Sequence, residues 1–537
     1  MSKQKKQSFL GGAAILAAAV AIVKGIGFFY KIPLNNTLDR VGKTYFDVAY
    51  QIYNVLLSVS TAGFPLALSK LVSEAQAKGR ENQKKRLFWV ALWLFLALGL
   101  MGSAFMLFGT RVITGMLHNE GAYSAIRALA PAVFFVCVLS CIRGYTQGQG
   151  NMTPSAASQV LEAVCKLGIG LPLAWYVVRA GGGMEKGAAG AIMGVTIGTA
   201  LSMVFLAAYL LLHRSPGNSL DVPDSRRSLL KRILLIGVPI TLSNSAMSII
   251  TLVDTSVVLG RLQEGLGLTE TAASALRGQY GYAMDMVNLP ASFVFPVTMS
   301  LIPAAAAALA RQDHAGADGI ISSAFRLIAI LALPCGVGLS VLSTPIMLLV
   351  LPAHPEDAPA AGVHLRVLGI ACIFICVMTL TNAILQTYGK ERLPVFTMIA
   401  GGAVKIVMNY VLVGNPEINI YGAPVSTLCC YMVIVALNLF FVWKYSPKKP
   451  KYLRLFARPA LASALMGCAA WAVCGFVGRA LSQGHSVYGA NALATLCGIF
   501  AGVVVYAVLV VALRILRAED LRGIPHGEKL ADMLHLR

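Results

Sequence analysis

The stretch Lys24-Gly-Ile-Gly-Phe-Phe-Tyr-Lys31-Ile-Pro33 interrupts the first apolar run of the chain with two lysines. A lysine at the centre of a membrane span costs about 3 kcal/mol on insertion scales, so its presence needs a reason. Lys24 and Lys31 are seven residues apart, which returns them to nearly the same helix face about 10.5 Å apart along the axis. Gly27 lies between them and would let a helix or ligand approach closely. We interpret Lys24 as a cavity-facing cation, Pro33 as a helix stop, and Lys31 as an interfacial anchor, with ligand binding as its alternative role.

The composition indicates a polytopic membrane protein. Of the 537 residues, 57% are hydrophobic and 12% are charged, and the mean hydropathy is +0.72. A soluble globule of this size would need more polar surface. The formal net charge of +21 comes from lysines and arginines in short loops, which is typical of topogenic charge and not of nucleic-acid binding. The 11 cysteines lie in or beside apolar segments without metal-ligand spacing, so we expect them to pack and predict no metal site.

Apolar segments of about 20 residues predict fourteen membrane helices and an all-α fold. These segments lie near residues 9–30, 45–71, 87–109, 123–142, 155–178, 188–212, 230–258, 279–308, 321–350, 363–387, 394–413, 420–443, 456–478 and 490–514. The predicted inner segments hold about 28 Lys and Arg residues, against about 10 on the outer side. The charge asymmetry and the even number of spans predict that both termini are cytoplasmic. The length of the first apolar run favours an uncleaved span over a signal peptide.

Three matches in order along the chain indicate an internal repeat. Phe64-Pro65-Leu-Ala-Leu-Ser69 recurs 231 residues later as Phe295-Pro296-Val-Thr-Met-Ser300. Gly190-Ala191 recurs as Gly422-Ala423, and Gln147, Gly150 and Lys166 are matched by Gln386, Gly389 and Lys405. The repeat predicts two parallel six-helix lobes in a V-shaped arrangement, 1–213 and 229–444. A cytoplasmic linker, 214–228, joins the lobes, and an extra helix pair, 456–514, precedes a cytoplasmic tail, 515–537.

Few ionisable residues fall well inside the predicted spans, and such residues are functional candidates by default. Glu162 and Lys166 are four residues apart on one helix, so they either neutralise each other or serve the function. Lys405 is the repeat equivalent of Lys166, but Gly401 occupies the position equivalent to Glu162. The charge of Lys405 is therefore not answered on its own helix, although Asn409 lies one turn further along and could share the polar face.

Asp254 is the acidic candidate in the seventh predicted span. Adding the 231-residue offset to Lys24 gives position 255, next to Asp254. We hypothesise that Lys24 and Asp254 face each other across a central cavity in one state and separate in another; alternatively, Asp254 binds a coupling cation. The predicted substrate-binding set is Lys24, Lys31, Lys166, Lys405 and Asn409, and the predicted coupling or gating residues are Asp254 and Glu162.

The sequence contains no recognisable enzyme constellation. It has no Gly-rich nucleotide loop followed by Lys-Ser/Thr, no His-Glu-x-x-His motif and no soluble domain large enough to bind ATP. We therefore expect a transporter without enzymatic activity or cofactor. Its driving force would be a monovalent cation gradient, the membrane potential or the gradient of the substrate.

Five stretches carry a family resemblance: Lys24–Pro33, Tyr50-Gln-Ile-Tyr53, Ser60-Thr-Ala-Gly-Phe-Pro65, Leu68-Ser-Lys-Leu-Val-Ser-Glu74 and Arg143-Gly-Tyr-Thr-Gln-Gly-Gln-Gly-Asn-Met-Thr-Pro154. They resemble the polysaccharide-transporter branch of the multidrug/oligosaccharidyl-lipid/polysaccharide exporter superfamily, and within it the stage V sporulation protein B group. The resemblance covers essentially the whole chain. It implies the two-lobe, alternating-access fold of MATE exporters and lipid II flippases.

The resemblance also implies a cargo and a location. The cargo would be a polyprenyl pyrophosphate carrying a saccharide for the cell wall or spore cortex, moved from the inner to the outer leaflet of the bacterial cytoplasmic membrane. We expect a monomer whose partners are this cargo and the membrane lipids. The related lipid II flippases line their cavity with arginines on helices 1, 2 and 8. Lys24 matches the first of these, whereas Tyr30 and the pair Leu57-Ser58 depart from the pattern. Buried ammonium groups suit an anionic pyrophosphate.

Three other functions stay open at this point. A cation-coupled multidrug exporter of the same superfamily would show a cavity dominated by carboxylates, whereas lysines dominate here. A membrane-embedded glycosyl polymerase or ligase would need catalytic groups on a long outer loop, and the predicted outer loops are short. A non-transporting scaffold of wall synthesis would have no need for buried charges.

Overall fold

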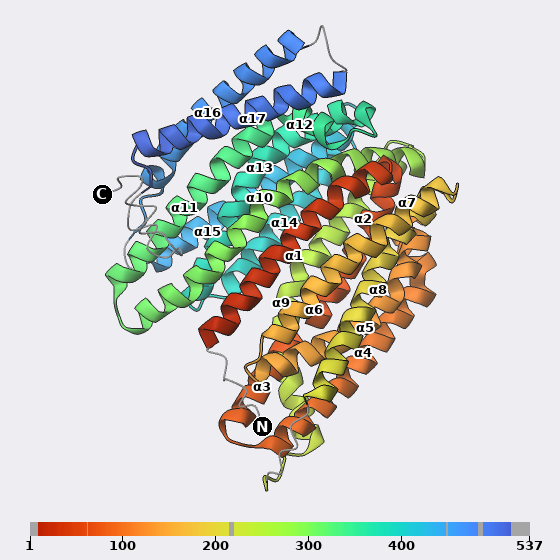
Figure 1. Cartoon of the computed structure of the whole chain (residues 1–537), viewed down its shortest axis with the longest axis vertical. Coiled ribbons are helices and arrows are strands. Elements are labelled where there is room, and N and C mark those ends of the chain that lie inside the picture. Colours follow the sequence, from red (N-terminus) through yellow and green to blue (C-terminus); the bar gives the residue numbers. More distant parts are fainter. Residues whose placement is uncertain (1–8, 62, 214–219, 447–448, 482–486, 517–537) are drawn as a thin grey trace. The chain divides into compact units, whose positions relative to one another are not determined.

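The chain is entirely helical wherever regular structure is described (Figure 1). The structure is a computed structural model that describes residues 9–61, 63–213, 220–446, 449–481 and 487–516. It divides into two compact units, Met1–Gly278 and Gln279–Arg537. The basic residues 3–6 and almost all of the predicted tail 515–537 lie outside the described residues.

The first unit contains the helices that precede the middle of the chain. They are α1 (Phe9–Thr37), α2 (Arg40–Thr61), α3 (Gly63–Ala77), α4 (Glu81–Met116), η1 (Glu120–Ala122), α5 (Tyr123–Gly148), α6 (Thr153–Cys165), η2 (Lys166–Gly170), α7 (Leu171–Arg179), α8 (Gly183–Leu212), α9 (Arg226–Gly260) and η3 (Arg261–Gly265). The first residues of α10 (Glu270–Ala310) complete the unit.

The second unit contains the rest of α10 and the remaining helices. They are α11 (His314–Val341), α12 (Ser343–Val350), η4 (Pro355–Asp357), α13 (Ala358–Thr387), α14 (Arg392–Leu412), η5 (Asn419–Tyr421), α15 (Gly422–Tyr445), α16 (Tyr452–Leu481) and α17 (Val487–Ala512). Helices α16 and α17 are the predicted extra pair and pack along each other.

Hydropathy predicts the membrane-spanning helices well. In the described ranges, 12 helical segments are long and apolar enough to cross a membrane, and each overlaps one predicted span. The other two predicted spans, 230–258 and 279–308, lie in α9 and α10, continuous helices of 35 and 41 residues. At about 1.5 Å per residue, both exceed the hydrocarbon thickness of about 30 Å. The predicted all-α, multi-pass fold is confirmed.

Pro33 does not end the first helix, so that prediction is wrong. Helix α1 runs on to Thr37 with Pro33 inside it. A proline in a helix removes one backbone hydrogen bond, but side chains support the last turn. The Thr37 hydroxyl donates to the Pro33 carbonyl oxygen (2.8 Å), and the Asn36 amide donates to the Ile32 carbonyl oxygen (2.9 Å). Lys31 therefore lies within the helix and not at its end.

The fifth predicted span, 155–178, is divided by a π-helical turn, η2. Pro172 follows this turn and has no N–H to donate to the Gly168 carbonyl, so a wider turn fits the chain there. Gly170 ends the turn, and a Cβ atom at this position would lie 2.7 Å from the Ala191 carbonyl oxygen of α8. The turn begins at Lys166, one of the predicted site residues.

The repeat-matched glycines have equivalent places in the two units. Gly150 and Gly389 follow α5 and α13 with positive φ angles of 79° and 69°, a conformation that favours glycine. Gly190 lets α8 approach α7, and Gly422 lets α15 approach α14. These equivalences agree with the predicted repeat. The side chains of Phe295 and Pro296, in another matched motif, lie outside the described residues.

The compact units divide after Gly278 and not at the predicted linker, 214–228. The reason is that α9 packs against α2 and α3, where a Cβ atom at Gly63 would lie 2.1 Å from the Gly237 carbonyl oxygen. The two lobes predicted from the sequence repeat, 1–213 and 229–444, therefore remain a prediction.

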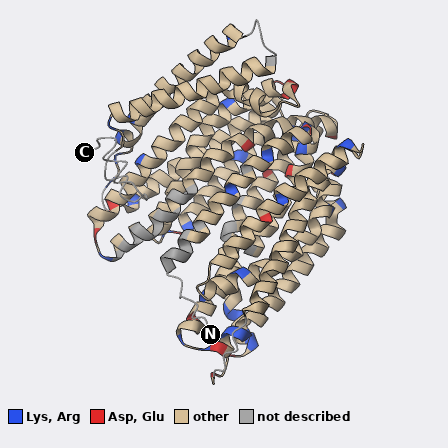
Figure 2. Ribbon diagram, viewed as in Figure 1, with Lys and Arg blue, Asp and Glu red and all other residues tan. Residues whose placement is uncertain are grey.

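The linker residues Asp221 to Asp224 bind the beginning of α4. The Asp221 carboxylate accepts hydrogen bonds from the backbone N–H groups of Asn82 (2.9 Å) and Gln83 (3.0 Å). It thus caps α4 in place of Arg80, whose own side chain makes no capping bond. The Gln83 side chain donates to the Asp224 carboxylate (2.9 Å) and accepts from its backbone N–H (2.7 Å). Figure 2 shows basic residues gathered where α3 and α4 meet.

Candidate functional site

The predicted site residues fall into two groups, one in each compact unit. In the first unit, Lys24 and Lys31 lie on α1, Glu162 on α6, Lys166 at the start of η2 and Asp254 on α9. In the second unit, Lys405 and Asn409 lie on α14.

Lys166 is held between two tyrosines from different helices. Its ammonium nitrogen donates a hydrogen bond to the Tyr50 hydroxyl of α2 (3.2 Å). The same nitrogen lies 4.3 Å from the Tyr50 ring centroid and 4.8 Å from the Tyr30 ring centroid of α1. These distances are typical of cation–π contacts, which are worth about 2 kcal/mol when desolvated. We call Lys166, Tyr30 and Tyr50 the tyrosine cradle.

Further aromatic residues of α2 extend the cradle. The Phe46 ring stacks on Tyr50 with centroids 5.6 Å apart, and the Tyr53 ring lies 5.6 Å from Tyr50. Tyr30 and Tyr53 are 1% and 2% exposed. Their hydroxyls have no hydrogen-bond partner among the described residues. A buried unpaired hydroxyl costs about 1–3 kcal/mol, so both groups have hydrogen-bonding capacity for a further partner.

Glu162 pairs with an arginine that follows the predicted span 123–142 directly. The Arg143 guanidinium of α5 lies 3.2 Å from the Glu162 carboxylate and donates to the Ser158 hydroxyl (2.8 Å). The expected alternative, an ion pair between Glu162 and Lys166, does not form among the described residues. Arg143 offers the carboxylate a planar donor group from the neighbouring helix, while the Lys166 ammonium bonds to the Tyr50 hydroxyl instead.

The charges of this region therefore do not cancel. Arg143 and Glu162 neutralise each other, and no carboxylate of the described residues lies within salt-bridge distance of Lys166. An ammonium has three donors, and one of them is used by Tyr50. Two donors and one positive charge remain to bind an anion or water in a low-dielectric environment.

Lys24 and Asp254 do not form an ion pair in this structure. Lys24 is exposed on α1. Asp254 is 4% exposed and has interactions of its own, but none between these two described residues. Their predicted approach in another state stays a prediction. Lys31 is half-buried and also has a partner.

In the second unit, Asn409 has a structural partner. It is fully buried, and its side-chain oxygen accepts a hydrogen bond from the Ser426 hydroxyl of α15. Lys405, one turn earlier, is half-buried and engaged in an interaction. A larger polar cluster, not predicted from the sequence, surrounds Asn438, which bonds to Thr397, Thr381 and Asn382. Uncharged residues of this kind give no signal in a search for intramembrane charges.

The sequence also missed the parts of the cradle other than Lys166. Tyr30, Tyr50 and Tyr53 appeared only in motifs, because a tyrosine in a membrane span is an ordinary packing or interfacial residue. Arg143 lies one residue beyond the predicted span 123–142, so it was not among the charges sought inside the spans. Helix α5 continues to Gly148, which brings Arg143 inside it.

The fold and the site together define a class. A multi-pass helical bundle with a cation, Lys166, that no described carboxylate neutralises has the architecture of a membrane transport protein. The chain belongs to the polysaccharide biosynthesis protein family, whose model matches residues 9–309.

Relatives are similar over nearly the full length. Stage V sporulation protein B of Bacillus subtilis (strain 168) is 25% identical over 529 residues, which cover 97% of this chain and 98% of that protein. Lipid II flippase MurJ of the same organism is 24% identical over 482 residues, which cover 86% and 87%.

Solved structures confirm the expected fold. Lipid II flippase MurJ in its inward closed conformation aligns with a TM-score of 0.67 and 15% identity, covering 93% of this chain and 98% of that one. A multidrug resistance MATE family transporter of the MOP superfamily, in an inward-facing conformation, aligns with a TM-score of 0.63 and 15% identity, covering 80% and 97%. The chain therefore has the MATE/MurJ-like fold of this superfamily.

Proposed function

We propose that this protein is an alternating-access flippase for a lipid-linked saccharide, a polyprenyl pyrophosphate carrying an oligosaccharide or peptidoglycan precursor. It would act in the bacterial cytoplasmic membrane, with both termini cytoplasmic, in cell-wall or spore-cortex synthesis. Two relatives named as a sporulation protein and a lipid II flippase support this reading. The observation that carries it is the uncompensated Lys166 ammonium in the tyrosine cradle.

The cradle has the chemistry to bind a pyrophosphate. Lys166 supplies a positive charge with two remaining donors, and hydrogen bonds to charged groups contribute about 1.5–3 kcal/mol each. The buried hydroxyls of Tyr30 and Tyr53 supply further donors. A lysine holds an anion as a point charge and releases it more readily than the bidentate fork of an arginine, which suits a carrier that must let its cargo go.

Hydrogen bonds join three predicted outer segments of the first unit, and we propose that they form an outer gate. The Thr44 hydroxyl donates to the Ser274 carbonyl oxygen (2.7 Å), and the Asn119 amide donates to the Ser274 hydroxyl (2.8 Å). The Gly121 backbone N–H donates to the Glu270 carboxylate (2.8 Å). The two neutral bonds contribute about 1 kcal/mol each and the bond to the Glu270 carboxylate about 1.5–3 kcal/mol, and we propose that the binding energy of a charged cargo opens this gate.

A drug-exporting role is the weaker alternative, because the fold is shared with MATE transporters and does not separate the two functions. An organic cation would meet an unpaired ammonium at the cradle and be repelled. If transport is coupled to a monovalent cation, Glu162 and Asp254 are the carboxylates that we propose to take part. We propose a monomer without enzymatic activity.

The test measures lipid-linked precursors by leaflet in cells depleted of this protein and of redundant exporters. The depleted cells are complemented with wild type, Lys166→Gln or Lys78→Gln, each expressed at the same level. Lys78 is an exposed lysine of the α3–α4 loop and serves as the matched charge control. We expect precursor to accumulate in the inner leaflet on depletion, and to reach the outer leaflet again with wild type and Lys78→Gln only. Unchanged outer-leaflet precursor after depletion would refute the function, and full rescue by Lys166→Gln would refute the site.

A further inference from the structure

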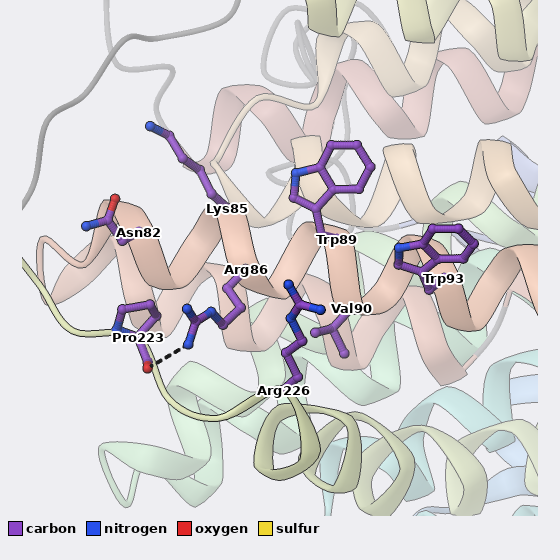
Figure 3. A pocket seen from close by; sticks show the side chains of 8 residues that line it. All are labelled: Asn82, Lys85, Arg86, Trp89, Val90, Trp93, Pro223 and Arg226. Carbon is purple, nitrogen blue, oxygen red and sulfur yellow. Dashed lines mark hydrogen bonds between the residues drawn. The ribbon is translucent and has the colours of Figure 1, made fainter.

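A second cationic site lies on the first unit, where α4 begins and the linker enters α9. It is a groove of about 630 Å³. Its lining includes Lys85, Arg86, Trp89, Trp93, Pro223 and Arg226 (Figure 3). Three of the described lining residues are cations and none is acidic. The tyrosine cradle uses none of these residues.

The nearby carboxylates are turned to other partners. Asp221 caps α4, and Asp224 binds Arg80 (3.0 Å) and Gln83. The linker presents backbone carbonyls to the groove instead. Arg86 donates through one guanidinium nitrogen to the carbonyl oxygens of Pro223 (3.1 Å) and Asp224 (3.2 Å).

These two bonds fix the direction of the Arg86 guanidinium at the edge of the groove. Its other nitrogens keep N–H donors for a ligand. Arg226 comes from the first residue of α9 and reaches toward the same space (Figure 3). The guanidinium groups of Arg86 and Arg226 reach toward one space without a lining carboxylate and form an anion site, while Lys85 extends from the Trp89 side of α4 (Figure 3).

The groove opens along the exposed face of α4. Trp89 and Trp93 are 53% and 70% exposed. Lys85 lies one turn before Trp89 on the same face and is also exposed. The face continues at intervals of three or four residues through Ala97, Met101, Phe105, Phe108, Val112 and Met116, all exposed. A helix face that runs from lysine through two tryptophans into exposed apolar residues is typical of a surface that passes from lipid headgroups into the hydrocarbon core.

The length of α4 places the groove at headgroup depth. Its 36 residues make a helix of about 54 Å, which exceeds the hydrocarbon core of about 30 Å by about 24 Å. If the excess is shared by the two ends, about the first eight residues lie outside the hydrocarbon. Lys85 and Arg86 are then at the phosphates, and Trp89 and Trp93 are at the boundary.

We propose that this groove binds the phosphate headgroup of an anionic phospholipid of the surrounding bilayer. Arg86 and Arg226 contact the phosphate, the exposed Lys85 adds positive charge at the same depth, and the two tryptophans contact the glycerol and upper acyl chains. Free phosphate and a polyprenyl pyrophosphate offer the same anionic chemistry. The exposed, lipid-facing stripe favours the bilayer phospholipid, because it gives acyl chains a continuous apolar surface beyond the headgroup. The bound lipid would join α4 to the linker and α9, a role separate from cargo transport.

The test uses full-length purified protein in nanodiscs and detergent. Native mass spectrometry and thermal unfolding are measured with phosphatidylglycerol, phosphatidylcholine, inorganic phosphate and polyprenyl pyrophosphate as separate probes. The variants are Lys85→Gln, Arg226→Gln and the double variant. Lys78→Gln is the control because it removes an exposed charge outside the groove. Arg86 is left intact because it also holds the linker.

We expect wild type and Lys78→Gln to retain phosphatidylglycerol over phosphatidylcholine, and phosphatidylglycerol to raise their unfolding temperature. Each lost cation near an anionic lipid surface should weaken retention about fivefold, and the double variant about 25-fold. Equal retention by all variants would overturn the proposal. Equal stabilisation by inorganic phosphate would also overturn it, because it would indicate an unspecific anion site. Selective retention of polyprenyl pyrophosphate would overturn it too, because it would indicate a cargo site.

Discussion

Replacing Asp221 with alanine should destabilise the first turn of α4, although Asp221 lies far from this turn in sequence. The Asp221 carboxylate accepts from the backbone N–H groups of Asn82 (2.9 Å) and Gln83 (3.0 Å), and its side chain is 12% exposed. Loss of a helix cap costs about 0.5–2 kcal/mol. We expect about 2 kcal/mol, the upper end, because the cap is ionised, bonds two donors and lies at the positive end of the helix dipole.

Hydrogen exchange measures this change where it occurs. A loss of about 2 kcal/mol in local opening free energy makes exchange about thirtyfold faster, and a peptide that covers residues 80–86 reports it. Asp221→Asn keeps an acceptor and loses the charge, so its effect should be smaller, about fivefold. Asp313→Ala is the matched control: Asp313 caps α11 through the Gly316 N–H (2.8 Å), so it should loosen α11 and leave residues 80–86 unchanged. Unchanged exchange at residues 80–86 in Asp221→Ala would refute the capping role.

Three further predictions concern the same unit. A hydrogen bond from Arg80, aided by Gln83 and nearby cations, lowers the pKa of Asp224 below its usual 3.8. The stabilisation that the ionised Asp224 carboxylate gives to the fold is therefore complete above about pH 4 and is lost as the pH falls through its lowered pKa in the folded state. Hydrogen exchange of the linker should become faster in that pH range in wild type and should respond less to acid in Asp224→Asn. Gly278→Ala puts a Cβ atom 1.8 Å from the Arg40 carbonyl oxygen, so it should destabilise the protein by about 1–3 kcal/mol, seen as a lower unfolding temperature; an unchanged temperature would contradict this packing. Thr44→Val removes the bond to Ser274 and should speed exchange at residues 118–122 about fivefold; unchanged exchange there would count against the outer gate.

The spans were predictable because the membrane imposes length and hydropathy on each helix directly. Details inside helices were less predictable. Pro33 looked like a helix stop, yet the helix continues to Thr37, and the side chains of Thr37 and Asn36 bond to backbone carbonyls of its last turn. Such bonding depends on local geometry that a count of apolar residues does not contain.

The site was predictable in part for a similar reason. Lys166 stood out because a charge in a span is costly. Its partners did not stand out, since Tyr30 and Tyr50 come from two other helices and are ordinary residues in sequence. The spacing of Glu162 and Lys166 allowed a local ion pair or a functional role, but the carboxylate pairs with Arg143 of a neighbouring helix. Pairing across helices is set by packing, which spacing along one helix cannot reveal.

The linker shows the same limit. Its polarity predicted a connection between the two halves of the chain, but not that Asp221 would cap α4 from 139 residues away. The helix start itself offers only Arg80 as a cap. A helix without a local capping residue is a signal that another segment supplies one.

The most direct test of the central claim is lipid transport by the purified protein in proteoliposomes. A fluorescent polyprenyl-pyrophosphate saccharide is placed in one leaflet, and its appearance in the other is followed by a membrane-impermeant quencher for wild type, Lys166→Gln and Lys78→Gln. We predict movement by wild type and Lys78→Gln, and a rate at least about tenfold lower for Lys166→Gln, which loses about 1.4 kcal/mol or more of charge-assisted binding. No movement by wild type, or an equal rate for Lys166→Gln, would contradict the account.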